Sequence, residues 1–255
     1  NKNAKWSNGD PVTADDFVWS WKRILTASLG SQYPDMLYYL VGAYEYHNGQ
    51  IDNFDEVGVK ALDTHTLKVN LKNPTPFFIG LLSHYSTWPV HKETVLKHGD
   101  IDDRNGEWTR PGNFVCNGPF QLKTWELNNK IVVEKNPHYY DASMVRLNEI
   151  HYYPVSNVMT EDRMFRAGQL HLTSSMPTQK CPIYIEEKNP NLKIDPYMGT
   201  YFYRINTENE TLSDVRVRKA LAYSIDRQLL VDKVTQCGQI PAYSFTPPGS
   251  NGYQP

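Results

Sequence analysis

The sequence has few cysteines, no long apolar run and no dominant charge, and each shortage argues against a class of protein. Only three cysteines occur among 255 residues, and no CxxC pair is present, so neither a zinc site nor a redox-active dithiol is indicated. The longest apolar runs, such as Phe77–Leu82, are far shorter than the roughly 20 residues of a membrane-spanning helix. Basic and acidic residues nearly cancel, 26 against 28, which removes the electrostatic basis for binding nucleic acid or an anionic membrane.

Motifs for nucleotide binding, nucleophilic catalysis and metal binding are also missing. The chain contains no GxGxxG, GxxxxGK[ST], GxSxG or HExxH sequence. Pro89 lies between His84 and His91 and argues against one continuous helix that presents both to a metal. The adjacent pairs at 15–16 and 102–103 are aspartates, which we interpret as a helix cap and a solvated loop because neighbouring side chains diverge. We therefore expect no cofactor, no metal and no enzymatic activity.

Aromatic residues, by contrast, are abundant, with 17 Tyr, 6 Trp and 9 Phe. Tyr and Trp join an apolar face to a polar tip, and such side chains line surfaces that hold varied partners. The alternative is that these rings fill a large core, as aromatic rings often do. The composition leaves both interpretations open.

The cysteines and the chain ends give two further expectations. Cys116, Cys181 and Cys237 lie far apart, which is compatible with one disulfide and one free thiol but decides nothing about the compartment. The sequence begins at Asn1 with neither an initiator Met nor a signal peptide, and it ends in the turn-rich stretch TPPGSNGYQP. We therefore expect a piece of a longer chain.

Hydrophobic periodicity predicts interspersed helices and strands. A helix begins at Thr13, because Thr13 can cap its first turn and Asp15 and Asp16 favour the positive end of the helix dipole. Apolar residues then recur at helical spacing through Leu25. Alternating patterns predict hairpins at 57–71 and 120–134 and a short strand at 150–153.

The same patterns predict the remaining elements. Helices are expected at 33–46, at 77–82 as a short buried helix, at 156–167 from Ser156, and from Ser213, with Gly238 marking the end of that helix or of a following one. Strands are expected at 170–174 and 194–205, the second with Tyr197, Tyr201 and Tyr203 on one parity. Because hairpins and crossovers both occur, the predicted fold class is mixed α/β with more than one lobe.

Five stretches, in order along the chain, resemble signature segments of the family 5 extracytoplasmic solute-binding proteins of ABC importers. They are AKWSNGDPVTADDFVWSWKRI at 4–24, VEKNPHYYD at 133–141, RAGQLHLT at 166–173, SDVRVRKALAYSIDRQLLVDKV at 213–234 and PAYSFTPP at 241–248. Within this oligopeptide-, dipeptide- and nickel-binding family, GVKALDTHTLKVNL, NPTPFF and DPYMGTYFYRIN are most similar to the oligopeptide-binding members.

The resemblance implies a mixed, multi-lobed periplasmic-binding-protein-like fold of type II, incomplete in this chain. Residues 1–92 would form a lobe like the family's second, smaller lobe, 93–198 part of the first lobe and 199–255 the beginning of the third. It also implies a bacterial protein, periplasmic or on the cell surface, that closes over an extended oligopeptide and delivers it to the permease subunits of an ABC importer. We expect a monomer without a membrane span.

The resemblance also implies which residues line the binding cleft: Tyr33, His84, Thr173, Ser174, Ser175, Tyr197 and Phe202. Relatives carry Tyr-Asn-Asn at 173–175 and a tyrosine at Phe202, so the pattern of donors differs here. Gly199 replaces a cysteine that relatives pair with one in the third lobe, so that disulfide should be missing. The groups that bind the peptide's charged ends are implied to lie beyond Pro255. Except at Tyr33 and Tyr197, pocket lining and plain packing remain equally open.

Two alternatives compete with oligopeptide binding. The same fold could bind another cargo, such as a dipeptide, a cell-wall peptide, haem or a nickel complex. A second alternative is a secreted hydrolase or a glycan-binding domain that uses the aromatic residues. The second alternative needs a catalytic set or a stacked aromatic platform, and the sequence signals neither.

Overall fold

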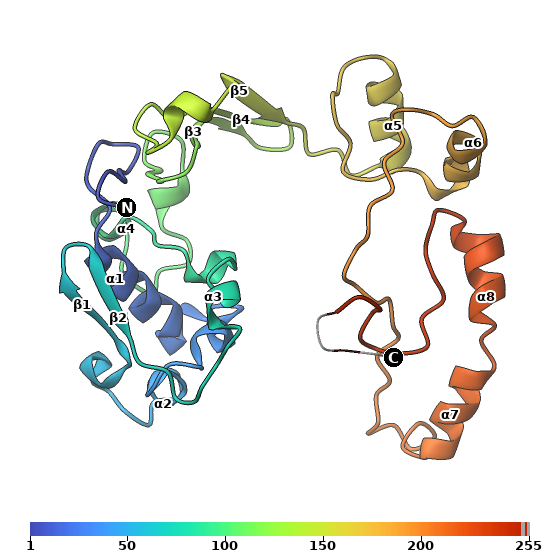
Figure 1. Cartoon of the computed structure of the whole chain (residues 1–255), viewed down its shortest axis with the longest axis horizontal. Coiled ribbons are helices and arrows are strands. Elements are labelled where there is room, and N and C mark those ends of the chain that lie inside the picture. The colour runs from blue at the N-terminus through green and yellow to red at the C-terminus, as the bar shows by residue number, and fades with distance from the viewer. Residues whose placement is uncertain (251–252, 254–255) are drawn as a thin grey trace. The chain divides into compact units, whose positions relative to one another are not determined.

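The computed structural model describes residues 1–250 and residue 253, and the chain divides into two compact units, Asn1–Pro154 and Val155–Pro255. Each unit is described by itself (Figure 1). The last residues of the predicted turn-rich tail, 251–252 and 254–255, lie outside the described residues. No helix in the described part of the chain is long and apolar enough to cross a membrane.

The first unit begins with helix α1 (Ala14–Leu25), whose N-terminus lies where the sequence predicts it. The Asp16 carboxylate accepts hydrogen bonds from the backbone N–H of Thr13 at 2.7 Å and from its hydroxyl at 3.1 Å. This capping box satisfies groups that a helix end leaves without intrahelical partners. Trp21 and Leu25, on the inner face of α1, are buried at the centre of the core.

A hairpin of strands β1 (Val59–Asp63) and β2 (Thr66–Val69) packs against α1, which confirms the first predicted hairpin. The core between them contains apolar side chains from the hairpin, from α1, from the segment between the two and from Phe78 beyond the hairpin. Its buried members are Trp21, Leu25, Leu37, Leu40, Ala43, Phe54, Val57, Val59 and Phe78.

The helix predicted at 33–46 is wrong as one element. The structure has a 3-10 turn at Pro34–Leu37 and a separate helix α2 (Ala43–His47). Gly42 separates them with a φ of +71°, and a Cβ at this position would lie 2.8 Å from the carbonyl oxygen of Glu56. The close approach of two backbone segments therefore breaks the helical periodicity.

Helix α3 (Phe78–Leu81) confirms the helix predicted near 77–82, but its predicted burial is wrong. Phe78 is buried in the core, whereas Phe77 is 54% exposed and Ile79 is 77% exposed. A helix this short presents both faces to its surroundings, so an apolar run cannot indicate which residues are covered. Helix α4 (Lys92–Lys97) follows, and its first turn is capped by His91.

The first unit ends in an antiparallel three-stranded sheet in the order β3-β4-β5. The strands are β3 (Phe120–Glu126), β4 (Lys130–Lys135) and β5 (Glu149–Tyr152), which confirms the second predicted hairpin and the short strand. Further 3-10 turns in this unit lie at Ala27–Leu29, Phe54–Glu56, Tyr85–Thr87, Glu107–Thr109 and Ala142–Met144.

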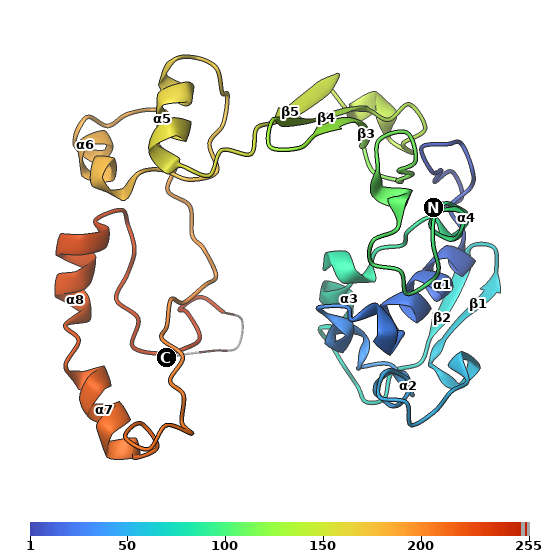
Figure 2. The same ribbon diagram turned by 180° about the vertical axis from the view of Figure 1, so that it is seen from behind.

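The second unit contains helices α5 (Val158–Arg166), α6 (Cys181–Glu186), α7 (Val215–Tyr223) and α8 (Arg227–Leu230) (Figure 2). A 3-10 turn at Thr178–Lys180 leads into α6, and a π-type turn at Val231–Thr235 follows α8. The predicted caps Ser156 and Ser213 are each wrong by one residue. The side chains of Asn157 and Asp214 accept the capping hydrogen bonds, as the commonest cap residues do.

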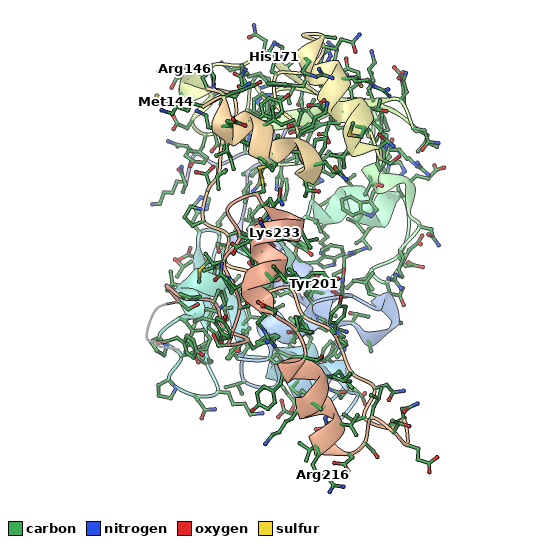
Figure 3. The ribbon with its side chains drawn as sticks, turned by 90° about the vertical axis from the view of Figure 1, so that its right-hand side faces the viewer. Met144, Arg146, His171, Tyr201, Arg216 and Lys233 are labelled. Carbon is green, nitrogen blue, oxygen red and sulfur yellow. A yellow bond between two sulfur atoms is a disulfide. The ribbon has the colours of Figure 1, made fainter. Side chains whose placement is uncertain are left out.

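The strands predicted at 170–174 and 194–205 are wrong. Neither range forms a strand, and no described strand of the second unit is available to pair with them. An extended segment becomes a strand only when another segment completes its ladder of backbone hydrogen bonds. Tyr197, Tyr201 and Tyr203 remain 88%, 87% and 74% exposed, and Tyr201 is labelled in Figure 3.

A disulfide joins Cys181 at the start of α6 to Cys237 beyond α8, while Cys116 is a free thiol. The sequence leaves the pairing open, and the structure gives one bridge within the second unit. This bridge does not involve position 199, where this chain has Gly199 and the resemblance implies a cysteine in relatives. Burial raises the pKa of the Cys116 thiol.

Candidate functional site

The structure brings together Tyr33 and His84, two of the predicted site residues. Tyr33 precedes the 3-10 turn at Pro34–Leu37, and His84 precedes the one at Tyr85–Thr87. Their ring centroids lie 5.1 Å apart in an edge-to-face arrangement, and Tyr85 stacks on His84 at 4.4 Å. Tyr85 also meets Tyr33 edge-on at 5.8 Å, so the three rings form one aromatic cluster.

Local hydrogen bonds hold the turn that carries His84. Its Nδ1 lies 2.8 Å from the Ser86 hydroxyl and accepts from the Ser86 backbone N–H at 3.3 Å. The Thr87 hydroxyl donates to the carbonyl oxygens of Leu82 and His84. Ser86 and Thr87 are buried, so their side chains are committed to the turn, whereas His84 keeps part of its ring accessible.

Tyr33 and Tyr85 of the aromatic cluster line a hollow of about 170 Å³ in the first unit, whereas His84 is not among its lining residues. Its lining residues come from α1, from the loop before Tyr33 and from the turn after His84: Ser20, Arg23, Ile24, Ser31, Gln32, Tyr33, Tyr85, Ser86, Trp88 and Val90. Tyr85 and Trp88 are 59% and 58% exposed and were not singled out from the sequence. The one sequence feature that could have pointed to them is their closeness to His84 in the stretch HYSTWPV.

The pKa values of two side chains that line this hollow, Arg23 and Tyr85, are shifted by their surroundings. Burial lowers the pKa of the Arg23 guanidinium, although Asp103 and Asp102 oppose this effect. Arg23 also donates to the carbonyl oxygen of Asp103 at 3.1 Å. The pKa of Tyr85 is raised, mainly by partial burial and to a smaller extent by the neighbouring Tyr33 hydroxyl. The hollow can therefore offer ring faces, hydroxyl groups and one cation to a ligand.

A second hollow of about 430 Å³ lies in the same unit and has mostly apolar walls. Phe17 and Trp21 of α1 face it, together with side chains of β2 and α3. Trp88 is among the lining residues of both hollows.

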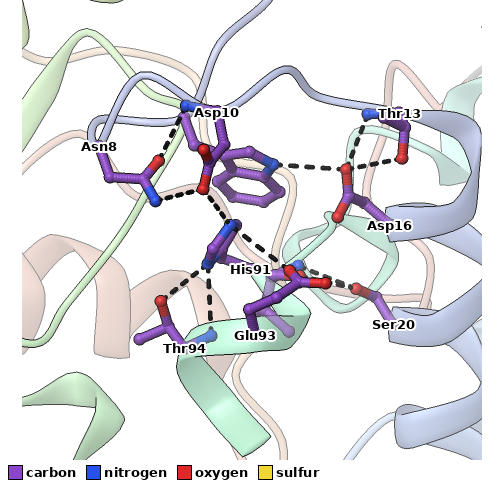
Figure 4. Close-up of polar contacts among 10 residues, drawn as sticks. Asn8, Asp10, Thr13, Asp16, Ser20, His91, Glu93 and Thr94 are labelled. Carbon is purple, nitrogen blue, oxygen red and sulfur yellow. Dashed lines mark hydrogen bonds and ion pairs between the residues drawn. The ribbon is translucent and has the colours of Figure 1, made fainter. Parts of the chain in front are cut away.

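The first of the segments that resemble the family, at 4–24, is built into a structural cluster (Figure 4). The indole N–H of Trp6 donates to Asp16 at 3.3 Å. The Nε2 of buried His91 lies 3.2 Å from Asp10 and 3.5 Å from Glu93. His91 Nδ1 lies 2.7 Å from the hydroxyl of Thr94. Both ring nitrogens of His91 are thus committed to protein partners.

Among the described residues, no group of three or more His, Cys, Asp or Glu side chains is arranged so that it could hold a metal ion.

In the second unit, the predicted residues Thr173, Ser174 and Ser175 follow α5. One oxygen of Glu161 accepts both the backbone N–H of Ser174, at 2.6 Å, and its hydroxyl, at 3.1 Å. Thr173 is half-buried and Ser175 is exposed. Glu161 is buried, and sequence reasoning missed it because the burial of a carboxylate leaves no periodic signal.

Asp162, the neighbour of Glu161, is the centre of an ionic cluster. Its carboxylate binds Lys180 and Arg166 and accepts from the Tyr184 hydroxyl at 3.2 Å. Burial alone would raise the pKa of the Asp162 carboxyl. The combined effect of Lys180, Tyr184 and Arg166 is larger, so the pKa of Asp162 is lowered. Asp162 therefore joins α5 to α6.

Tyr197 and Phe202 are not brought together with residues 173–175 by any described contact. The Tyr197 ring lies against Gly199, where a Cβ would come within 2.2 Å of it. Phe202 is 46% exposed and packs edge-on against Phe245 at 4.9 Å. Their role in a binding cleft remains a prediction.

Comparisons with known proteins agree over the whole chain. The family model for bacterial extracellular solute-binding proteins, family 5 Middle, matches residues 1–255. The periplasmic oligopeptide-binding protein OppA of Salmonella typhimurium is 40% identical over 262 residues, which cover 98% of this chain and 46% of the relative. The chain thus spans about half the length of the curated relatives it matches.

Two solved structures share the fold. The Escherichia coli murein tripeptide-binding protein MppA superposes with a TM-score of 0.90 at 34% identity, covering 100% of this chain and 49% of that one. The structure of Haemophilus influenzae OppA in complex with RPPGFSPFR superposes with a TM-score of 0.87 at 34% identity. The match covers 97% of this chain and 47% of that one. The mixed helix-and-sheet fold is therefore that of the periplasmic peptide-binding proteins, as expected. The chain belongs to family 5 of the bacterial extracellular solute-binding proteins.

Proposed function

We propose that this protein binds oligopeptides outside the cytoplasm and delivers them to the permease subunits of an ABC importer. The observation that carries the proposal is the aromatic cluster of Tyr33, His84 and Tyr85 beside a hollow in the first unit. Relatives named as oligopeptide-binding proteins support it. The role requires binding and release only, so the proposed protein is not an enzyme.

The proposed mechanism separates affinity from sequence preference. Backbone hydrogen bonds hold the extended peptide in the way that an added strand is held, and these bonds are common to all peptides. Peptide side chains enter hollows such as the one beside Tyr33, where water completes their hydrogen bonding. Ring faces and hydroxyl groups suit a site that accepts varied side chains, because they favour no single charge.

Closure of lobes around the peptide completes the proposal. We assign residues 1–92 to the second lobe of the family, 93–198 to the first and 199–255 to the third. Thr173, Ser175, Tyr197 and Phe202 would then meet the peptide when the lobes close around it. We propose that the protein does this as a monomer in the periplasm or at the cell surface.

Native mass spectrometry of the full-length protein as purified tests the cargo. We expect a series of small-peptide adducts, because a site that relies on backbone bonds retains a mixture. One discrete adduct mass would instead favour a dedicated ligand. Binding of one dedicated ligand is the second candidate function, because some relatives are named as murein peptide-binding and dipeptide-binding proteins. A protein without adducts that also fails to bind any dipeptide, murein peptide or three- to five-residue peptide in calorimetry would contradict both candidates.

A further inference from the structure

Helix α5 carries two adjacent buried carboxylates that contact the segment containing the candidate site residues 173–175. Glu161 is 7% exposed and Asp162 is 6% exposed. A buried carboxylate is costly unless hydrogen bonds or opposite charges compensate it. The partners of both carboxylates lie on one stretch of chain, residues 174–184, apart from Arg166 of α5 itself.

Glu161 holds the N-terminal end of this stretch. Its Oε1 accepts the backbone N–H of Ser174 at 2.6 Å and the hydroxyl at 3.1 Å. Both donors of Ser174 are therefore engaged by one oxygen, and neither can be offered to a peptide without breaking that contact. The donors that remain for a ligand in this segment are those of Thr173 and Ser175.

Asp162 holds the C-terminal end of the stretch. It pairs with the Lys180 ammonium group and accepts from the Tyr184 hydroxyl of α6. Two successive residues of one helix thus fix both ends of residues 174–184. The disulfide from Cys181 also connects this stretch covalently to Cys237.

We propose that Glu161 is a positioning residue for peptide binding. By holding Ser174, it sets the place of Thr173 and Ser175, whose polar groups contact the peptide. Ser174 itself is an anchor and not a ligand contact. The inference rests on the proposed function, because it takes residues 173–175 as part of the peptide site.

Calorimetry with full-length protein and a set of three- to five-residue peptides of different sequence tests this role. Glu161→Ala should weaken all peptides by a similar factor of about tenfold, since the displaced segment meets groups common to every peptide. Glu161→Gln keeps an acceptor oxygen at the same place and should recover most of the affinity. Ser174→Ala keeps the backbone N–H bond to Glu161 and should change affinity by less than about threefold.

Two further variants separate positioning from folding. Glu161→Asp keeps the charge but withdraws the oxygen by one methylene, so an intermediate loss is expected even if the alanine variant does not fold. Glu186→Ala removes an exposed carboxylate of α6 and should leave affinity unchanged. Hydrogen exchange gives an independent readout, because the Ser174 amide should exchange faster in Glu161→Ala than in the wild type.

The outcomes distinguish this inference from the proposed function. Wild-type protein that binds none of the peptides would overturn the proposed function, and the positioning role with it. A different outcome would overturn the positioning role of Glu161 alone. In that case the wild type binds peptides normally, and the Glu161 variants have a lower melting temperature but unchanged affinities. A loss in Ser174→Ala as large as that in Glu161→Ala would show that the Ser174 hydroxyl contacts the peptide directly.

Discussion

The indole N–H of Trp21 donates a hydrogen bond of 2.8 Å to the backbone carbonyl oxygen of Thr87. Trp21 lies on α1 and is 1% exposed, and Thr87 ends the turn that carries His84 and Tyr85. One buried bond therefore joins the central helix of the first unit to the turn that contributes two rings of the aromatic cluster. Ser20 adds a second connection, because its hydroxyl accepts from the backbone N–H of Val90 at 2.9 Å.

Replacing Trp21 with Phe should destabilise the protein by about 1–3 kcal/mol, because the Thr87 carbonyl oxygen loses its buried donor. The smaller ring should also leave a void beside α1. Chemical denaturation measures the change. Trp125→Phe, at a position that is 41% exposed on β3, is the matched control and should change stability far less. Equal effects of the two substitutions would mean that the buried hydrogen bond contributes little.

Replacing Thr13 with Ala should lower the free energy of unfolding by about 1 kcal/mol, the usual cost of a lost helix cap. The Asp16 carboxylate would lose the Thr13 hydroxyl but keep the backbone N–H of residue 13 and the Trp6 indole. Thr13→Ser restores a hydroxyl and should recover most of the loss. An unchanged denaturation midpoint in Thr13→Ala would show that Asp16 alone caps α1.

Replacing Tyr33 with Ala in the full-length protein should weaken peptides unevenly. The ring borders one hollow, so only peptides that place a side chain there should lose affinity. Calorimetry across a peptide set measures the pattern. Tyr152→Ala removes an exposed tyrosine of β5 and should change no affinity. A uniform loss for every peptide would contradict the side-chain role of the hollow.

Asp162 should make the protein more stable above its ordinary carboxyl pKa of 3.8 than below it. Its pKa is lowered in the folded state, so the unfolded state takes up its proton first as the pH falls. The contribution is complete above pH 3.8 and is lost as the pH falls from there through the lowered folded-state value.

Asp162→Asn should remove this acid-dependent part of the stability. Denaturation curves at neutral and acidic pH measure the difference between wild type and variant. The difference should shrink as the pH falls, whereas a difference independent of pH would mean that the Asp162 charge is not responsible.

Breaking the disulfide should cost about 2–4 kcal/mol, because it closes a long loop in the unfolded chain. Peptide mapping without reductant should recover Cys181 joined to Cys237, and Cys181→Ala should lower the melting temperature. Cys116→Ser is the control, since Cys116 is not bridged. Recovery of Cys116 in a mixed disulfide with either partner would contradict this pairing.

Elements defined by local signals could be predicted from the sequence. Thr13 with its acidic first turn marks the start of α1, and alternation predicts the hairpins formed by β1 and β2 and by β3 and β4. The strands expected at 170–174 and 194–205 illustrate the limit. Alternation shows that a segment can be extended, but pairing depends on partners elsewhere in the chain.

The candidate site was predictable to a smaller extent. The likeness to the family pointed to Tyr33 and His84, and the structure places their rings in contact. Tyr85 and Trp88, which border the same hollow, had no periodic or motif signal of their own. Glu161 was not predictable, because nothing in the sequence distinguishes a carboxylate that is buried against Ser174 from one on a solvated helix face.

The bridge between Cys181 and Cys237 has a consequence for how cleavage of the chain would be detected. The exposed stretch at 194–205 lies between the two cysteines in sequence and has no regular secondary structure, which makes it a favourable target for proteases. A single cut there would leave two pieces covalently joined. Electrophoresis without reductant would show one intact band, and only reduction would separate the nicked polypeptide into its two parts.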